Sequence, residues 1–131
     1  MSADMTAARY RAACAALGLP VWRPGMRAVA ARPEPLEPVC TRAPDDLRGW
    51  TPYPGAEPDL GDPATVGCLL AAVREAWLDG GVHTKPAYWP ADGARWLALP
   101  PGGYAHGYGE TEADALIAAL EAAAARRGGQ T

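Results

Sequence analysis

Residues 59–77 read DLGDPATVGCLLAAVREAW, and this stretch decides the fold. Asp62 can accept hydrogen bonds from the free amides of a first helical turn, and Pro63 suits the first helical position because the helix needs no amide there. Apolar side chains then recur at steps of three and four residues, which gathers them on one helix face: Val66, Leu69, Leu70, Val73 and Trp77. We therefore expect a helix over residues 62–79 with one core-facing side, ended by Gly80 and Gly81.

Two further stretches have the pattern of helices. Residues 4–17 are rich in alanine and other good helix formers, with Asp4 as the expected N-cap and Gly18 as the end. Residues 111–127 begin at Thr111, whose hydroxyl can cap the first turn. The apolar stripe of this last helix consists of Leu116, Ile117, Leu120, Ala123 and Ala124.

The segment between the second and third expected helices predicts strands. Residues 82–89 and 94–99 flank a turn at 90–93 that contains Asp-Gly, which is typical of an antiparallel hairpin. Residues 104–108 can add a third strand, whose glycines permit a bulge or the close approach of another backbone. This order of elements favours the α+β class. We expect a small antiparallel sheet of three or more strands covered by helices, as an α/β/α or two-layer sandwich.

The region before the central helix is rich in proline. Eight of the 14 prolines lie between Pro33 and Pro63, and proline both removes backbone donors and opposes helix. We expect residues 32–61 to form a loop that covers the fold, because several apolar side chains punctuate it: Leu36, Val39, Leu47, Trp50 and Tyr53. Residues 19–22 and 26–30 are candidate short strands. The length suits a single domain over residues 1–131.

Composition excludes several classes of protein. The chain carries 12 basic and 15 acidic side chains, a formal net charge of −3, which offers no basic surface for nucleic acid. The cysteines lack a CxxC pair, so we expect reduced thiols, with Cys14 and Cys68 on inward helix faces and Cys40 in a loop. No signal-peptide pattern is present, and no apolar run approaches the ~20 residues that span a bilayer. We expect a cytoplasmic protein with no cofactor, no metal and no membrane partner.

His83 and His106 are the only histidines. If their two strands are neighbours, the imidazoles could meet across the sheet and act in acid–base catalysis. The twin His-x-Thr/Ser pattern of phosphoesterases is incomplete, because His106 lacks the second hydroxyl at that spacing. A metal would need a third ligand, which Asp92 or Glu110 could supply through the fold. We favour a structural role for both histidines and keep a small hydrolase as an alternative.

Aromatic side chains cluster on the expected hairpin. The candidate binding residues are Trp89, Trp96, Tyr104 and Tyr108 in the sheet region and Trp50 and Tyr53 in the proline-rich region. Alternation along the strands would divide the first group between the helix-covered face and the other face. Interface centres favour Tyr and Trp, whereas binders of single-stranded nucleic acid would need more Lys and Arg nearby. The alternative is that these residues form the core of a chain without phenylalanine.

Residues 49–127 resemble a group of small phage-encoded proteins. The resemblance rests on Gly49-Trp50, Pro58-Asp59-Leu60, the run from Asp62 to Leu70, Arg74-Glu75-Ala76-Trp77, and Thr111-Glu112-Ala113-Asp114-Ala115-Leu116 with the turn before it. These stretches are similar to the phage α-β-α (ABA) sandwich domain group, a group of unknown function with no catalytic residues to carry over. Residues 20–58 depart from the group, whose members carry more strand-like sequence there.

The resemblance implies a phage or prophage accessory protein. We expect a non-enzymatic module that binds another protein, such as a host or defence factor, in the cytoplasm of the host cell. The aromatic sheet surface and the proline-rich region are the expected contact regions. The alternatives are a virion or assembly protein, which would form a symmetric oligomer, and the small hydrolase described above.

Overall fold

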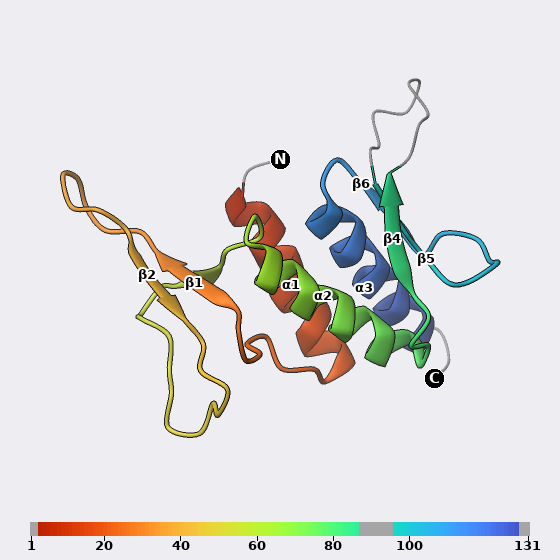
Figure 1. Cartoon of the computed structure of the whole chain (residues 1–131), viewed down its shortest axis with the longest axis horizontal. Coiled ribbons are helices and arrows are strands. Elements are labelled where there is room, and N and C mark those ends of the chain that lie inside the picture. Colours follow the sequence, from red (N-terminus) through yellow and green to blue (C-terminus); the bar gives the residue numbers. More distant parts are fainter. Residues whose placement is uncertain (1–2, 87–95, 129–131) are drawn as a thin grey trace. The chain divides into compact units, whose positions relative to one another are not determined.

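The computed structural model describes residues 3–86 and 96–128 (Figure 1). The described elements are α1 (Ala3–Leu17), β1 (Arg27–Ala30), β2 (Val39–Arg42), β3 (Glu57–Pro58), α2 (Pro63–Trp77), β4 (His83–Pro86), β5 (Trp96–Leu99), β6 (Gly107–Gly109) and α3 (Glu112–Gly128). The strands form two antiparallel three-stranded sheets, in the orders β2-β1-β3 and β4-β5-β6. The predicted α+β class is confirmed.

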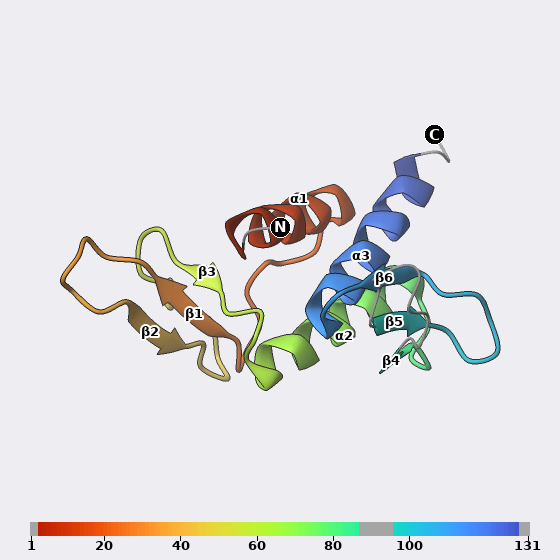
Figure 2. The ribbon, with the colours of Figure 1, turned by 90° about the horizontal axis from the view of Figure 1, so that it is seen from above.

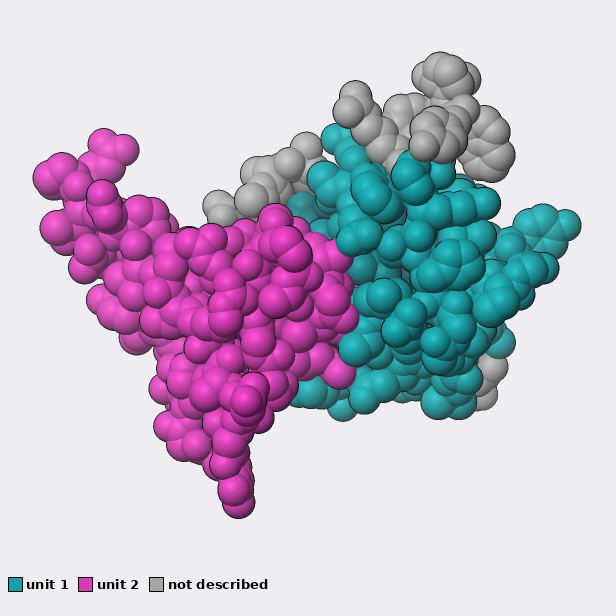
Figure 3. Space-filling model, viewed as in Figure 1, with its two compact units in different colours: residues 1–21, 69–131 teal, residues 22–68 magenta. Residues whose placement is uncertain are grey.

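The chain divides into two compact units, shown in different colours in Figure 3. Unit 1 combines Met1–Val21 with Leu69–Thr131, and unit 2 is Trp22–Cys68. The helix α2 begins in unit 2 and continues in unit 1. A single domain over residues 1–131 stays a prediction. In the described part of the chain, every helix is too short or too polar to cross a bilayer.

Unit 1 contains the predicted antiparallel hairpin. β4 pairs with β5 over four residues, from His83 opposite Leu99 to Pro86 opposite Trp96. The predicted turn at 90–93 lies outside the described residues. The third strand, β6, pairs with β5 and begins at Gly107, three residues later than predicted.

The helix α3 packs directly on the backbone of β6 (Figure 2). A Cβ atom on Gly107 would lie 2.5 Å from both the Ala115 carbonyl oxygen and the Ala119 nitrogen, and one on Gly109 would overlap Asp114. Only glycine fits at such separations, so the predicted close approach of another backbone is confirmed. The third strand forms at these glycines because the helix can reach the backbone only there.

Among the described elements of unit 1, α3 contributes more buried side chains to the core than any other. Its buried side chains are Ala113, Ala115, Leu116, Ile117, Ala119, Leu120 and Ala123. The predicted stripe is confirmed except at Ala124, which is half-buried. α1 packs against α3, with an ion pair between Arg9 and Glu121. Tyr10 of α1 is fully buried, and its hydroxyl donates to the Val21 carbonyl at 2.6 Å. Residues 19–22 do not form the short strand that the sequence predicted.

The starts of α2 and α3 follow the predicted caps. The Asp62 carboxylate accepts a hydrogen bond from the Thr65 amide at 3.1 Å. The Thr111 hydroxyl accepts one from the Asp114 amide at 3.1 Å. α1 begins at Ala3, so Asp4 lies within that helix and the prediction of Asp4 as its N-cap is wrong.

The predicted core face of α2 is confirmed in part. Leu69 and Val73 are fully buried, whereas the other three predicted residues are half-buried: Val66, Leu70 and Trp77. Thr65 is fully buried as well, and the hydrogen bond that its hydroxyl accepts from the Arg27 amide at 2.9 Å offsets the cost of burying this polar group. A polar contact therefore takes part of the face that the apolar pattern assigned to the core.

The ends of α1 and α2 share a hydrogen-bond pattern but differ in the residue that reverses the chain. Gly18 follows α1 with a φ of +70°, which glycine adopts without steric cost. Leu78 follows α2 with a φ of +53°, and the next amide, of Asp79, donates to the Arg74 carbonyl at 3.0 Å. The predicted stop at Gly80 is therefore wrong, because a leucine in the left-handed conformation ends the helix earlier.

Unit 2 contains a second sheet, with β1 at its centre. β1 corresponds to the strand predicted at 26–30, and its buried residues are Ala28 and Ala30. β2 and β3 come from residues 32–61, where the sequence predicted a loop, and each pairs antiparallel with β1. Pro58 is compatible with pairing because β3 lies at a sheet edge. That residues 32–61 cover the fold stays a prediction.

Candidate functional site

The sheet β4-β5-β6 has one face toward α3 and one face away from it. Gly107 and Gly109 lie on the α3 side, because their Cβ positions point at the helix backbone. Side chains alternate along a strand, so Tyr108 lies on the opposite side, where 53% of it is exposed. Tyr108 pairs with Leu97, and Leu97 pairs with Lys85, which places the three residues in one row. We call this row the Tyr108 face.

The remaining predicted aromatic residues of this region are divided. Tyr104 lies in the loop before β6, outside the strand predicted there, and is 96% exposed. Trp96 pairs with Gly109, so it lies on the α3 side and is half-buried. Trp89 lies outside the described residues. Among the described residues of this region, Tyr104 and Tyr108 are therefore the aromatic side chains that a partner can contact, while Trp96 belongs to the layer between sheet and helix.

The predicted aromatic residues of unit 2 have different environments. Trp50 is half-buried and packs edge-on against Trp22, with ring centroids 5.9 Å apart and planes at 77°. Tyr53 is 47% exposed. Trp50 therefore stabilises unit 2, and Tyr53 is the predicted residue of this unit that presents its ring to solvent.

The strand order separates the two histidines. β5 lies between β4 and β6, with His83 opposite Leu99 and the His106 amide donating to the Ala98 carbonyl at 2.7 Å. Two interstrand spacings of about 4.8 Å each therefore lie between the two backbones. His83 is exposed, with Nδ1 3.2 Å from the Gly81 carbonyl oxygen. The neighbouring-strand arrangement on which acid–base catalysis depended does not form.

His106 stacks on Trp77 of α2 instead. The two ring centroids are 3.6 Å apart and the planes meet at 8°. The Trp77 indole donates to the Ala119 carbonyl at 3.0 Å, and the Arg126 guanidinium lies 4.9 Å from the Trp77 ring centroid. Burial lowers the pKa of His106, Asp79 opposes this lowering, and Arg126 adds to it. The surroundings therefore favour the neutral imidazole.

A pocket of about 210 Å³ opens at the C-terminal ends of α2 and α3. Its lining residues are Ala76, Trp77, Leu78, Ala123, Arg126 and Arg127. Arg127 is fixed in the wall, because Nη1 donates to the Leu17 carbonyl at 3.0 Å and Nη2 to the Ala76 carbonyl at 3.4 Å. Sequence reasoning missed this pocket, since nothing in the spacing of Trp77 and Arg126 indicates that their helices end side by side.

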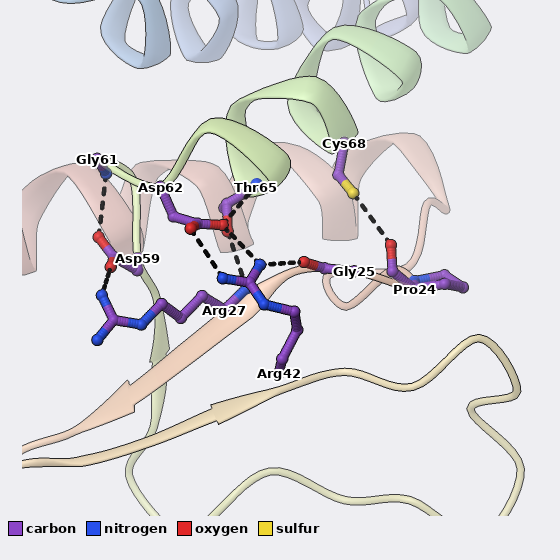
Figure 4. Close-up of polar contacts among 9 residues, drawn as sticks. All are labelled: Pro24, Gly25, Arg27, Arg42, Asp59, Gly61, Asp62, Thr65 and Cys68. Carbon is purple, nitrogen blue, oxygen red and sulfur yellow. Dashed lines mark hydrogen bonds and ion pairs between the residues drawn. The ribbon is translucent and has the colours of Figure 1, made fainter.

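Polar contacts in unit 2 gather at the start of α2 (Figure 4). Arg42 contacts both carboxylate oxygens of Asp62, at 2.9 and 3.0 Å. Arg27 contacts Asp59 at 2.6 Å. The hydrogen bonds from Arg42, together with those from Thr65, hold the pKa of the Asp62 carboxyl well below its usual range. These carboxylates are engaged in fixing strands to a helix start, which is a structural role.

The cysteines are unpaired in the described residues. Cys14 is buried, and Cys68 is half-buried with its Sγ donating to the Pro24 carbonyl at 3.4 Å. Cys40 is exposed on β2, so the prediction that it lies in a loop is wrong. Across residues 3–86 and 96–128, no group of three His, Cys, Asp or Glu side chains is arranged to hold a metal ion.

Comparison with family models, curated proteins and solved structures gives no match for this chain. Two features of unit 1 bear on its function: the exposed Tyr104 and Tyr108, and the pocket at the helix ends.

Proposed function

We propose that this protein is a non-enzymatic binding module and that Tyr104 and Tyr108 form the centre of its contact with a protein partner. The observation that carries the proposal is the exposure of two tyrosines on and beside one sheet, 96% for Tyr104 and 53% for Tyr108. Tyrosine is enriched among the residues that dominate binding energy at protein interfaces, because it offers a large rigid ring with a polar end.

The rigidity of the sheet supports this assignment. Tyr108 lies between two glycines whose backbone is fixed against α3, so the direction of its Cα–Cβ bond is set by the packing of unit 1. Side chains on a fixed scaffold lose less conformational freedom on binding than side chains on a mobile loop. On the Tyr108 face, Leu97 is buried and Tyr108 is exposed, so Tyr108 is the side chain that β6 directs toward a partner.

The resemblance of residues 49–127 to the phage sandwich group supports the biological setting. We propose a phage or prophage accessory protein that acts on a host or defence factor in the cytoplasm of the host cell. A virion or assembly protein is the second candidate, since exposed tyrosines can also join copies of one chain. The two separated histidines give the small-hydrolase alternative no shared acid–base site.

The test is affinity capture of the tagged chain from its host, followed by native mass determination and reconstitution with the purified partner. The double variant Tyr104→Ala, Tyr108→Ala should raise the Kd several hundredfold, because interface anchors contribute about 2 kcal/mol each and every ~1.4 kcal/mol is about tenfold in Kd. Met5→Ala is the matched control, since Met5 is 58% exposed but lies on α1, outside both expected contact regions.

An unchanged Kd in the double variant, with the fold intact by circular dichroism, would refute the proposed surface. A symmetric homo-oligomer that retains no other protein would replace the binding-module assignment with the assembly alternative.

A further inference from the structure

The pocket at the ends of α2 and α3 combines an apolar wall with two guanidinium groups. The Trp77 indole is fixed by its hydrogen bond to the Ala119 carbonyl, and Arg126 lies over the same ring. Leu78 is 89% exposed and belongs to the pocket lining. A ligand here meets a planar ring, an aliphatic side chain and a positive charge together.

The positive charge of this pocket is not balanced by a bound carboxylate. Four other arginines of the described chain pair with acids: Arg9 with Glu121, Arg27 with Asp59, Arg42 with Asp62 and Arg48 with Asp46. Arg32 and Arg74 donate to backbone carbonyls. Within the described residues, the contact of Arg126 is with a ring, and Arg127 donates to two neutral carbonyls. The five N–H donors of the Arg126 guanidinium are therefore available to an external carboxylate.

The size of the pocket limits the ligand. Its volume of about 210 Å³ is below the roughly 300–1,000 Å³ of sites that bury small molecules or cofactors. The space suits one or two amino-acid side chains. A peptide segment that inserts its side chains while its backbone stays outside meets this limit.

The backbone of Leu78 gives an independent sign that this corner is adapted to a contact. Leu78 occupies the left-handed conformation in which Gly18 ends α1, although glycine would avoid the steric cost. Its large apolar side chain is held out into solvent beside the pocket. Residues in strained backbone conformations concentrate at binding sites, where the position of the side chain contributes to binding and so compensates for the strain.

We infer that this pocket binds an acidic segment of a partner polypeptide, with a side-chain carboxylate on Arg126 and an adjacent apolar side chain against Trp77 and Leu78. Arginine pairs with a carboxylate through two parallel N–H donors, which fixes the orientation of the segment. The indole beneath the guanidinium keeps Arg126 in place through a cation–π contact, so less freedom is lost on binding.

The test uses the full chain and a blocked tetrapeptide of alternating glutamate and leucine, followed by nuclear magnetic resonance of the Trp77 indole N–H. This resonance is assigned from the spectrum of Trp77→Phe. We expect saturable shifts with a millimolar Kd that rises with salt, because the contact is between exposed charges. The same peptide with glutamine in place of glutamate should bind about tenfold more weakly.

Two variants make the test specific. Arg126→Gln should weaken binding of the glutamate peptide about tenfold, whereas Arg32→Gln removes the same charge in unit 2 and should leave binding unchanged. Leu78→Gly should weaken binding while it raises the melting temperature, a combination that general damage to the fold would not produce.

Three results would each overturn the inference. The first is an unshifted Trp77 signal at about 20 mM peptide, a concentration that would nearly saturate a roughly millimolar contact. The others are equal affinity for the glutamate and glutamine peptides, and wild-type affinity in Arg126→Gln. The inference is separate from the proposed Tyr104 and Tyr108 contact. The double variant Tyr104→Ala, Tyr108→Ala should bind the glutamate peptide normally, so the two proposals can fail independently.

Discussion

The two sheets of this protein are stabilised by different interactions. In unit 1, α3 lies on the backbone of β6 at Gly107, and the core combines alanines with many larger leucine, isoleucine, valine and tyrosine side chains. In unit 2, the buried apolar side chains of the described residues are Met26, Ala28, Ala30, Ala43 and Pro58. Charged contacts at the start of α2 join its strands instead, through Arg42 with Asp62 and Arg27 with Asp59.

The difference predicts how each unit responds to perturbation. Apolar burial stabilises in proportion to area, and alanine contributes little area, so unit 2 depends more on its capped helix start and ion pairs. Those contacts weaken in acid and at high salt, whereas close packing in unit 1 does not. Steric changes should therefore damage unit 1 most, and charge changes should damage unit 2 most.

The largest expected effect is that of Gly107→Ala. The added methyl would lie 2.5 Å from two backbone atoms of α3, which cannot move as a side chain could. We expect a loss of about 3 kcal/mol in the free energy of unfolding, measured by urea denaturation. Gly67→Ala is the control, because its Cβ would meet open space within α2. That change should stabilise by about 1 kcal/mol, and a similar loss in both variants would contradict the packing account.

The next effect is that of Asp62→Ala in unit 2. The change removes the N-cap of α2 and the two-point contact with Arg42, so we expect a loss of about 1–2 kcal/mol. Asp46→Ala should cost much less, because the pair of Asp46 with Arg48 is largely exposed. Equal losses in the two variants, measured by thermal denaturation, would argue against the importance of the helix start.

The pH dependence of Asp62 has a defined sign. Its folded pKa is depressed, chiefly by the hydrogen bonds from Arg42, so the carboxylate stabilises the fold above its unfolded pKa of about 3.9. This contribution is lost as the pH falls through the lower folded pKa. Asp62→Ala should therefore have a shallower decline of stability below about pH 4 than the wild type.

A smaller effect of opposite sign is expected for Leu78→Gly. Glycine relieves the positive φ of +53° that leucine adopts after α2, and the side chain removed is 89% exposed. We expect a gain of about 1 kcal/mol in the free energy of unfolding. Gly18→Ala places a side chain in the same turn after α1 and should cost a similar amount. A destabilised Leu78→Gly would show that Leu78 makes a contact worth more than the strain.

The smallest effect is the pH dependence from His106. Its folded pKa is lowered, first by burial, so the neutral ring stabilises the fold above the unfolded pKa of about 6.5. That stability is lost as the pH falls below this value through the lower folded pKa. His106→Gln should flatten stability between pH 8 and pH 5, and His83→Gln is the control. An unchanged slope in His106→Gln would contradict the account of His106 as half-buried in a stack on Trp77.

The parts of the fold that sequence could predict are those that depend on near neighbours. Asp62 and Thr111 cap their helices, and Leu116 to Leu120 belong to a buried stripe, because these patterns act within a few residues. The Gly107 strand was shifted by three residues, since its position depends on a helix that follows it. A pattern within a few residues cannot predict where a strand begins when contacts with a distant element decide its position.

The candidate sites were harder to predict than the fold. Composition and strand alternation predict Tyr104 and Tyr108 as candidate binding residues. The pairing of His83 with His106 depends on the strand order, which the sequence does not reveal. The proline content of residues 32–61 predicts a loop, but β2 and β3 form there because pairing with β1 needs only short edge segments. The pocket with Arg126 arises where helix ends meet, which no local pattern encodes.

The most direct test of the difference between the units is amide hydrogen exchange resolved by residue, in the wild type and in Asp62→Ala. We predict that the amides of β5 exchange by global unfolding and stay the most protected amides in Asp62→Ala. The amides of β1 should exchange through a local opening of lower free energy, and Asp62→Ala should lower that free energy further. Equal protection of β1 and β5 in the wild type, with a uniform decrease in the variant, would contradict the account.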